Sequence, residues 1–355
     1  MSGSNDAIME IGNVLHALEW QADHAAKNGA PATGRVIRAM IPLLDGPSRC
    51  AAQMRSWPGL SLEDAMPLRF AGGLHNLFLT GRAQQLGAVY RGEVTDQTAI
   101  DALVAQLTLA HDADLLTWFD GPPQTNEAGR SASVMAQLLW LAERLGPRFE
   151  LLELGGSAGI NTMMDRFHFD LGGVELGDPA SPMRIAPEWR GAPPPRTGVE
   201  ISAIRGCDIA PIDLTDPAAA LRLKSYVWAE VIQRLDRIDA AAALAAQRPP
   251  QVERADAGDW VERQLAVPQA SGVTRVLFHT VVWQYVPAAS RERIVQAMEQ
   301  AGAAATKERP LAWVTVETNR QTFKHELRTR YWPGGAEPVL LGEAHAHGAW
   351  VDWRG

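Results

Sequence analysis

The segment LLELGGSAGIN, residues 151–161, carries the residue types and spacing best suited to chemistry. It is typical of a strand, a glycine turn and the start of a helix. Glycines let the backbone turn sharply and approach a ligand closely, and the free N–H groups of a helix N-terminus attract polar or anionic groups. A dinucleotide fingerprint needs glycine at the first, third and sixth places, but serine and isoleucine stand at the third and sixth places counted from Gly155. Glu153, Gly155 and Gly159 instead give the pattern Glu-x-Gly-x-x-x-Gly.

This pattern resembles the first motif of class I S-adenosylmethionine (SAM) dependent methyltransferases. In that family the acidic residue contacts the amino group of the cofactor, directly or through water, and the tight turn suits a ligand without a pyrophosphate. The resemblance therefore implies SAM as the cofactor. The cofactor-binding residues that it implies on this segment are Glu153, Gly155, Gly156, Ser157, Gly159 and Asn161.

Acidic residues also follow the next two predicted strands. Asp208 ends the second strand, where a carboxylate can accept hydrogen bonds from both ribose hydroxyls. Its distance along the chain from the glycine turn far exceeds the usual spacing of about 20 residues, so an inserted hairpin must account for the excess, and Glu175 or Asp178 is the rival. Asp256 and Ala257 follow the third strand, where the resembled superfamily places an Asp–small pair at the adenine. A turn or helix-cap role is the alternative for both aspartates.

The fourth predicted strand and its loop, TRVLFHTVVWQYVP, supply candidate catalytic groups. In methyltransferases this loop faces the methyl group and the acceptor. His279 is a candidate general base, because imidazole titrates near neutral pH, and it is also a candidate cofactor contact. Tyr285 is a second catalytic candidate, and Trp283 is a candidate substrate contact. The alternative is a hydrogen-bonded core histidine beside packed aromatic residues.

The tract QTNEAGRS is richer in functional groups than a linker requires. Gln124, Asn126 and Arg130 are candidate contacts for the acceptor or for the methionine end of the cofactor, and Glu127 is a candidate catalytic residue. A capping tract with an internal Glu127–Arg130 pair is the alternative. His75, in GGLHNLFL, is a further candidate substrate contact, with a structural histidine as its alternative.

A serine hydrolase is the main competing chemistry. Residues 155–159 satisfy the G-x-S-x-G elbow, and Asp256 followed by His345 or His347 keeps the required order. The helical character of the preceding chain argues against a hydrolase, whose nucleophile strand follows several others. His345 and His347 lie two apart on a predicted strand, but no third ligand accompanies them, so no metal site is expected.

The predicted secondary structure that positions these residues changes near residue 149, from helices alone to strands alternating with helices. Helical patterns come before it, at 8–28, 34–44, 61–90 (as two short helices, because Pro67 and Gly72-Gly73 break the segment), 95–115 and 131–145. Strands are predicted after it at 149–154, about 198–206, 249–257, 274–283 and 311–319, with helices from Ile160, from Asp216 to about Ala246 and from Ala288. The tail from Glu326 to Trp353 predicts two or three antiparallel strands. This alternation implies a doubly wound parallel sheet with helices on both faces.

Composition excludes several classes of protein. The chain has 355 residues, of which 46% are hydrophobic and 21% are charged, as in ordinary globular proteins. A formal net charge of -8 disfavours sequence-independent nucleic-acid binding. Two cysteines cannot build a disulfide framework, and neither a membrane span nor a signal peptide is recognisable. We expect a cytoplasmic protein with no nucleic-acid or membrane partner.

From about residue 66 onward the chain is similar to a bacterial family of uncharacterised proteins with a class I methyltransferase-like fold. The motifs that carry the similarity are LRFAGGLHNLFLTG, QTNEAGRS, LELGGSAGIN, GDPASP, RGCDIAPID, ADAGDW, LFHTVVWQYV and HAHGAWVDW. The resemblance implies the fold and SAM as the cofactor, and it identifies no acceptor.

The predicted fold is therefore α/β, with a doubly wound, Rossmann-like, mostly parallel sheet over residues 121–355 and an inserted hairpin and loop at about 168–200. A helical N-terminal domain over residues 1–120 is expected to act as a lid. The predicted function is SAM-dependent methylation of an unknown small-molecule or protein acceptor. The alternatives are a catalytically silent SAM-binding regulatory module and a serine hydrolase that uses Ser157.

Overall fold

The computed structural model describes residues 13–58 and 64–355, which fall into two compact units. The first comprises the chain up to Thr125 together with Pro217–Asp236, and the second comprises Asn126–Asp216 and Arg237–Gly355. Pro217–Asp236 was expected in the α/β region but belongs to the helical unit. The long helix predicted from Asp216 is in fact two helices, α10 (Pro217–Ser225) and α11 (Ile232–Gln247).

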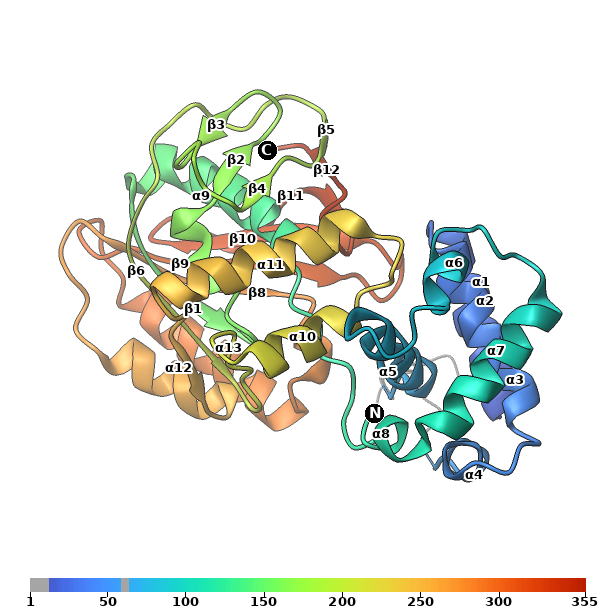
Figure 1. Ribbon diagram of the computed structural model, residues 1–355. Coiled ribbons are helices and arrows are strands. Elements are labelled where there is room, and N and C mark those ends of the chain that lie inside the picture. Colours follow the sequence, from blue (N-terminus) through green and yellow to red (C-terminus); the bar gives the residue numbers. More distant parts are fainter. Residues whose placement is uncertain (1–12, 59–63) are drawn as a thin grey trace. The chain divides into compact units, whose positions relative to one another are not determined.

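The first unit is helical (Figure 1). Ile8 and Ile11, expected on its first helix, lie outside the described residues. Its core is formed by buried aliphatic and aromatic side chains such as Phe70 and Leu74. Its helices, besides α10, are α1 (Val14–Lys27), α2 (Pro31–Arg38), α3 (Met40–Leu43), α4 (Arg49–Arg55), α5 (Met66–Leu79), α6 (Leu86–Tyr90), α7 (Gln97–Ala110) and α8 (Asp112–Leu116).

Helix α5 runs unbroken through Gly72 and Gly73, where the sequence pattern predicted a break. A Cβ atom at Gly72 would lie 2.8 Å from the Tyr226 ring, and one at Gly73 would lie 3.0 Å from the Trp118 ring. The glycines therefore permit close packing inside a helix, and the break between the two helices comes after Leu79.

The second unit contains a nine-stranded, mostly parallel sheet in the order β5-β12-β11-β10-β9-β8-β1-β6-β7 (Figure 1). The five strands from β9 to β7 in this order are parallel to one another, and β10, β11 and β12 continue the sheet as antiparallel neighbours. The strands are β1 (Arg148–Leu154), β5 (Glu188–Arg190), β6 (Glu200–Asp208), β7 (Val252–Arg254), β8 (Thr274–Thr280), β9 (Leu311–Thr318), β10 (His325–Trp332), β11 (Gly335–Ala344) and β12 (Trp350–Trp353).

Helices cover both faces of this sheet. Thr329 on β10 donates a hydrogen bond to Gln137 of α9 (Ser131–Leu145), whereas its neighbour Arg330 pairs with Glu299 of α13 (Ala288–Ala303). Successive strand residues point to opposite faces, so α9 and α13 lie on opposite sides. Helix α12 (Ala257–Ala266) packs beside α13.

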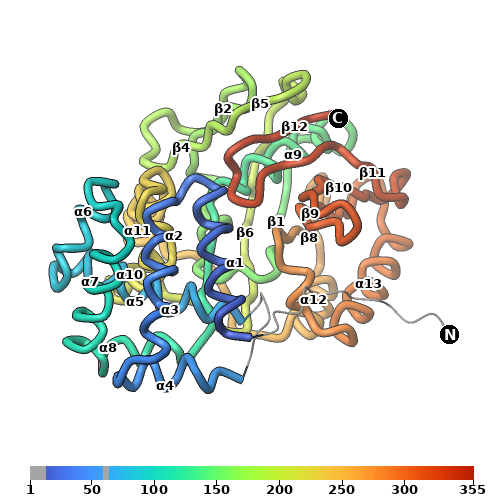
Figure 2. The backbone as a smooth tube through the Cα atoms, turned by 90° about the vertical axis from the view of Figure 1, so that its right-hand side faces the viewer, coloured from blue at the N-terminus to red at the C-terminus, as the bar shows by residue number. Residues whose placement is uncertain are grey.

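The connection from β1 to β6 has the expected helix start and inserted hairpin region, but the helix is of the 3₁₀ type. A six-residue 3₁₀ helix, η2 (Asn161–Arg166), follows the glycine turn. The chain then forms a small sheet of order β3-β2-β4, made of β2 (His168–Asp170), β3 (Glu175–Leu176) and β4 (Arg184–Ile185). In Figures 1 and 2 this small sheet lies near β5, β12 and the C-terminus. Paired glycines and prolines throughout the segment favour turns over a longer helix.

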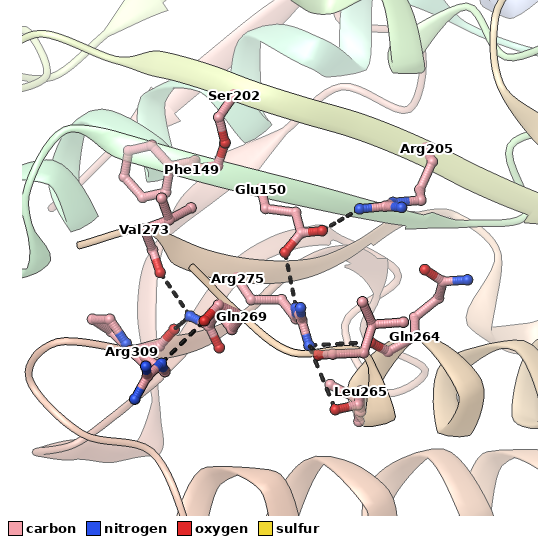
Figure 3. Close-up of polar contacts among 12 residues, drawn as sticks. Phe149, Glu150, Ser202, Arg205, Gln264, Leu265, Gln269, Val273, Arg275 and Arg309 are labelled. Atoms are coloured by element: carbon pink, nitrogen blue, oxygen red, sulfur yellow. Dashed lines mark hydrogen bonds and ion pairs between the residues drawn. The ribbon is translucent and has the colours of Figure 1, made fainter. Parts of the chain in front are cut away.

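A partly buried charged cluster, centred on the buried Arg275, lies toward the amino ends of β1 and β8 (Figure 3). Glu150 on β1 pairs with Arg205 on β6 and with Arg275 on β8, the latter at 3.0 Å. Arg275 also donates to the backbone carbonyls of Gln264 and Val267 at the end of α12. The cluster therefore connects three strands and a helix, at the opposite end of the sheet from the glycine turn.

Candidate functional site

Glu153 is a buried carboxyl group at the carboxyl end of β1. Its side chain is 1% exposed. Asn161 Nδ2 donates to its Oε1 over 3.3 Å, whereas its Oε2 has no hydrogen-bond partner among the described residues. Burial raises the pKa of Glu153 to about 8, assisted by the nearby Asp208 carboxylate and opposed by the Asn161 hydrogen bond and by Arg130. The carboxyl group therefore holds a proton to a higher pH than an exposed glutamate does.

The glycine turn after Glu153 is shaped mainly by contacts within the protein. Gly155 and Gly159 have φ of 64° and 71°, which glycine adopts without strain. A Cβ at Gly155 would lie 2.2 Å from Val282, and one at Gly159 would lie 2.5 Å from Pro250. The close approaches at these two glycines are thus to side chains of this chain. Gly156 is different, because a Cβ there would meet Glu153 Oε2 at 3.4 Å, an ordinary contact.

Asp208 reaches the turn directly. Its Oδ2 accepts a 2.9 Å hydrogen bond from the backbone N–H of Ser157, and its Oδ1 accepts one of 2.8 Å from Ala210. The rivals Glu175 and Asp178 are exposed on and beside the small sheet. Asp208 is therefore the acidic residue in contact with the glycine turn, and its role at a ribose stays a prediction.

Asp256 caps α12. Its Oδ1 accepts hydrogen bonds from the N–H groups of Gly258 and Asp259, and its Oδ2 accepts one from Ser290 Oγ. Desolvation would raise the pKa of Asp256, but these bonds and Arg293 outweigh it and lower the pKa. Both oxygens already have donors, and Ala257 is the first residue of the helix. Contact of this pair with an adenine stays a prediction.

Replacing Asp256 with alanine should lower the free energy of unfolding by about 1 kcal/mol, because α12 loses its N-terminal cap. Asp259→Ala is the matched control, since Asp259 lies in the same turn but pairs with the half-exposed Arg293. Urea denaturation of both variants measures the difference. Equal losses in the two variants would contradict the capping role.

His279 is buried on β8 with both ring nitrogens engaged. Its Nδ1 lies 2.6 Å from Glu317 Oε1, and Trp313 Nε1 donates to its Nε2 over 3.1 Å. Because the indole can only donate, Nε2 must be the acceptor and Nδ1 must carry the proton, so the ring is neutral. Trp283 stacks on it, with ring centroids 4.9 Å apart. To act as a general base toward a ligand, His279 would first have to give up the bond from Trp313.

Glu317 and Trp313 are the members of this network that sequence reasoning missed. Glu317 also accepts hydrogen bonds from the N–H groups of Val282 and Trp283 at 3.0 and 3.3 Å. Burial would raise the pKa of Glu317, but the bonds from His279 and from the backbone lower it. A glutamate inside the apolar run LAWVTVETN was the available signal. Tyr285, which follows in the same loop, is 59% exposed.

Three residues of the polar tract QTNEAGRS make hydrogen bonds or ion pairs with other parts of the α/β unit. Asn126 Oδ1 accepts from the N–H of Ile160 at 2.7 Å, so it contacts the glycine turn. Glu127 caps the short helix η1 (Ala128–Arg130) and pairs with the buried Arg237. Arg130 donates to the carbonyls of Thr280 and Ala346. The cap by Glu127 fits the capping alternative in part, since the ion pair shown for Glu127 is with Arg237, whereas the alternative named Arg130. The ligand contacts of Asn126, Glu127 and Arg130 stay predictions.

His75 and Gln124 belong to the helical unit. His75 Nδ1 lies 3.1 Å from the carbonyl oxygen of Ser225, and its ring packs against Phe78 and Tyr90. Burial lowers the pKa of His75. These contacts are those of a structural histidine, and the predicted substrate contacts of His75 and Gln124 remain predictions.

Ser157 has only part of the geometry of a hydrolase nucleophile. Its φ of 49° is uncommon for a residue other than glycine and also occurs in nucleophile elbows. However, its buried Oγ has no hydrogen-bond partner among the described residues, so no histidine activates it. His345 Nδ1 instead accepts from the N–H of His347. Within residues 13–58 and 64–355, no group of three or more His, Cys, Asp or Glu side chains could hold a metal ion.

Two of the four described non-glycine residues with positive φ lie at this edge of the sheet, and the other two are Ala65 and Phe323. Besides Ser157 after β1, Val281 directly after β8 has φ of 55°, which is a rare conformation for a β-branched residue. Strained conformations of this kind cluster at functional sites. Ser157 and Val281 therefore mark the carboxyl ends of β1 and β8 as the candidate site.

A family model described as an uncharacterised protein conserved in bacteria, DUF2332, matches residues 15–353. The chain belongs to this family. No curated protein and no solved structure matches the chain. The DUF2332 description names no ligand or reaction, so the chemistry of this DUF2332 protein is inferred from its site. None of the helices in the described part of the chain is both long and apolar enough to cross a membrane.

Proposed function

We propose that the protein binds SAM at the carboxyl ends of β1 and β6 and transfers its methyl group to a small-molecule or protein acceptor. The observation that carries the proposal is Glu153, a buried carboxyl group with one unpartnered oxygen beside a glycine turn that Asp208 contacts. Strand order supports it, because β1 lies between β6 and β8, where a doubly wound sheet changes direction. Ligands of such sheets bind outside the carboxyl ends of the strands at this point.

The residues present fit the cofactor. Buried polar atoms without partners are rare in native proteins, yet Glu153 Oε2, Asn161 Oδ1 and Ser157 Oγ are three of them on one short segment. An ammonium group would give the two acceptor oxygens the donors that they lack. Each Asp208 oxygen accepts one backbone hydrogen bond and retains capacity for a ribose hydroxyl. Bound SAM would supply an electrophilic methyl group.

The chain's own contribution to methyl transfer is then mainly positioning. Glu153 and Asp208 hold the two ends of the cofactor, and Arg130 fixes the end of β8 through the carbonyl of Thr280. His279 orients Glu317 and the stacked Trp283. No proton transfer is assigned to His279, because both its nitrogens have partners.

The catalytically silent module is the second candidate, and the occupied nitrogens of His279 favour it. Calorimetric titration of the full chain with SAM and with S-adenosylhomocysteine tests the binding that both candidates require. We expect both ligands to bind with a thermal shift. Absence of heat and of a thermal shift at millimolar ligand would refute the cofactor. Turnover of SAM with a panel of metabolites supports the methyltransferase, whereas binding without turnover supports the module.

The hydrolase alternative predicts a different result. A fluorophosphonate probe should leave the protein unlabelled, because Ser157 Oγ has no base beside it. Labelling is measured by intact mass, with Ser157→Ala as the control. Labelling of the natural chain that disappears in Ser157→Ala would establish the nucleophile and overturn the cofactor proposal.

A further inference from the structure

A polar groove lies where β9 ends and β10 begins, within the α/β unit. It encloses about 430 Å³, which falls in the range of about 300–1,000 Å³ for small-molecule sites. Thr315 on its wall is paired with His279 of β8 in the sheet register. Its charged lining residues are Glu317, Arg320, Glu326 and Arg328.

Two of these four charges neutralise each other. Arg328 Nε lies 2.7 Å from Glu326 Oε2, and Asn319 Nδ2 donates to Glu326 Oε1 over 2.8 Å. Both oxygens of Glu326 therefore have partners from the groove itself. This pair is part of the wall and offers little to a ligand.

The other two charged residues of the groove, Glu317 and Arg320, are not neutralised by a charged partner among the described residues. The three donors to Glu317, from His279, Val282 and Trp283, all reach Oε1, and Oε2 has no partner among the described residues. The neutral His279 ring does not cancel the charge of this carboxylate. Arg320 is exposed and makes no ion pair or hydrogen bond within the described part of the chain.

The groove therefore presents one uncompensated anion and one uncompensated cation. A ligand with both an ammonium and a carboxylate complements this arrangement, since a carboxylate can take two parallel hydrogen bonds from a guanidinium. We propose that the groove binds a small zwitterionic amino acid, with its ammonium at Glu317 Oε2 and its carboxylate at Arg320. The assignment concerns binding alone and goes beyond the proposed cofactor site, because it requires no SAM.

The test uses the full chain without SAM. Calorimetry with the proteinogenic L-amino acids, one at a time at millimolar concentration, identifies a binder. Its methyl ester, which lacks the carboxylate charge, and its N-acetyl derivative, which lacks the ammonium, should each bind at least about tenfold more weakly, because each loses a charge-assisted hydrogen bond.

Two variants localise the site. Glu317→Gln keeps an oxygen for the three donors but removes the charge, and Arg320→Gln removes the guanidinium. Each should weaken amino-acid binding by about tenfold. The exposed Arg184→Gln on the small sheet is the control and should bind as the natural chain does. Circular dichroism checks that the variants are folded.

Three outcomes would overturn the proposal: no amino acid binds, the ester and N-acetyl derivatives bind equally well, or both groove variants retain full affinity. A parallel titration with SAM reports on the proposed function separately. If SAM does not bind, the cofactor proposal fails, whereas the groove proposal still depends only on amino-acid binding. If no amino acid binds, the groove proposal fails, whereas the cofactor proposal still depends only on SAM binding.

Discussion

The Glu153→Gln variant is expected to bind S-adenosylhomocysteine about tenfold to a hundredfold more weakly than the natural chain, because a hydrogen bond between charged groups contributes about 1.5–3 kcal/mol. Glutamine has nearly the same shape as the protonated carboxyl group, so the buried site keeps its packing. The lost interaction is that between the carboxylate and the ammonium of the ligand. Calorimetric titration of both proteins measures the loss.

Methylthioadenosine provides the matched ligand control. It keeps the nucleoside but lacks the ammonium, so the variant should bind it as tightly as the natural chain does. Equal losses for the two ligands would mean that the glutamine substitution disturbs the turn generally. Unchanged binding of S-adenosylhomocysteine would show that the Glu153 carboxylate does not bind the ammonium of the ligand, and the proposed function would lose its main support.

The pH dependence of binding follows from the raised pKa of Glu153, about 8. Below this value the carboxyl group must release a proton before it pairs with an ammonium, so affinity should rise with pH toward about 8. At higher pH the α-amino group of the free ligand loses its proton and must take one up to bind as an ammonium, so affinity should fall. The rise on the acid side should be absent from Glu153→Gln.

Glu153 should also make the stability of the ligand-free protein depend on pH, and this stability should fall as pH rises toward about 8. The folded pKa of Glu153 lies above its ordinary value of 4.5, so the native state holds a proton that the unfolded state releases between these values. The stabilising contribution is complete below the unfolded pKa and is lost as pH rises through about 8. In the absence of ligand, Glu153→Gln should therefore gain thermal stability relative to the natural chain as pH increases.

Replacing Arg275 with methionine is expected to lower the free energy of unfolding by about 3–5 kcal/mol, as happens when one partner of a buried ion pair is removed. The Arg275 side chain is 3% exposed and pairs with Glu150 at 3.0 Å. Its loss also strips donors from the carbonyls of Gln264 and Val267 at the end of α12. Chemical denaturation monitored by tryptophan fluorescence measures the change.

Arg263→Met is the control for this second prediction. Arg263 also pairs with a glutamate, Glu253, but both side chains are about half exposed, and exposed pairs contribute little. A small loss in Arg263→Met beside a large loss in Arg275→Met would assign the effect to burial. Similar small losses of unfolding free energy in both variants would contradict the prediction and would show that the ion pair with Arg205 is enough to stabilise Glu150.

The sequence predicted the parallel part of the sheet well, because its strands are apolar runs with turn residues at their ends. Residues 149–154, for example, became β1, Arg148–Leu154, and residues 311–319 became β9, Leu311–Thr318. The segment after the glycine turn was predicted to begin a helix at Ile160 and to give way to an inserted hairpin at about residue 168. It forms the 3₁₀ helix η2 rather than an α-helix, followed by the small sheet. Gly72 and Gly73 were misread because their close tertiary contacts outweigh the low helix propensity of glycine.

The site was predictable where one motif specifies it locally. Glu153 and the turn lie on one short segment, and the contact of Asp208 with that turn follows from parallel strands that end at one edge. The Glu317–His279–Trp313 network joins β8 to β9 through side chains 34 to 38 residues apart. Such pairing depends on sheet register, which one sequence does not fix.

The contacts of Arg130 have a consequence for biosynthesis. Its guanidinium binds the carbonyl of Thr280, 150 residues further along, and that of Ala346, 216 residues further along. A ribosome must therefore have synthesised the chain as far as Ala346 before both bonds can form, although β1 and its glycine turn emerge much earlier. A nascent chain that stalls before Ala346 would carry β1 and the glycine turn without the Arg130 bonds that join the end of β8 to the segment around Ala346.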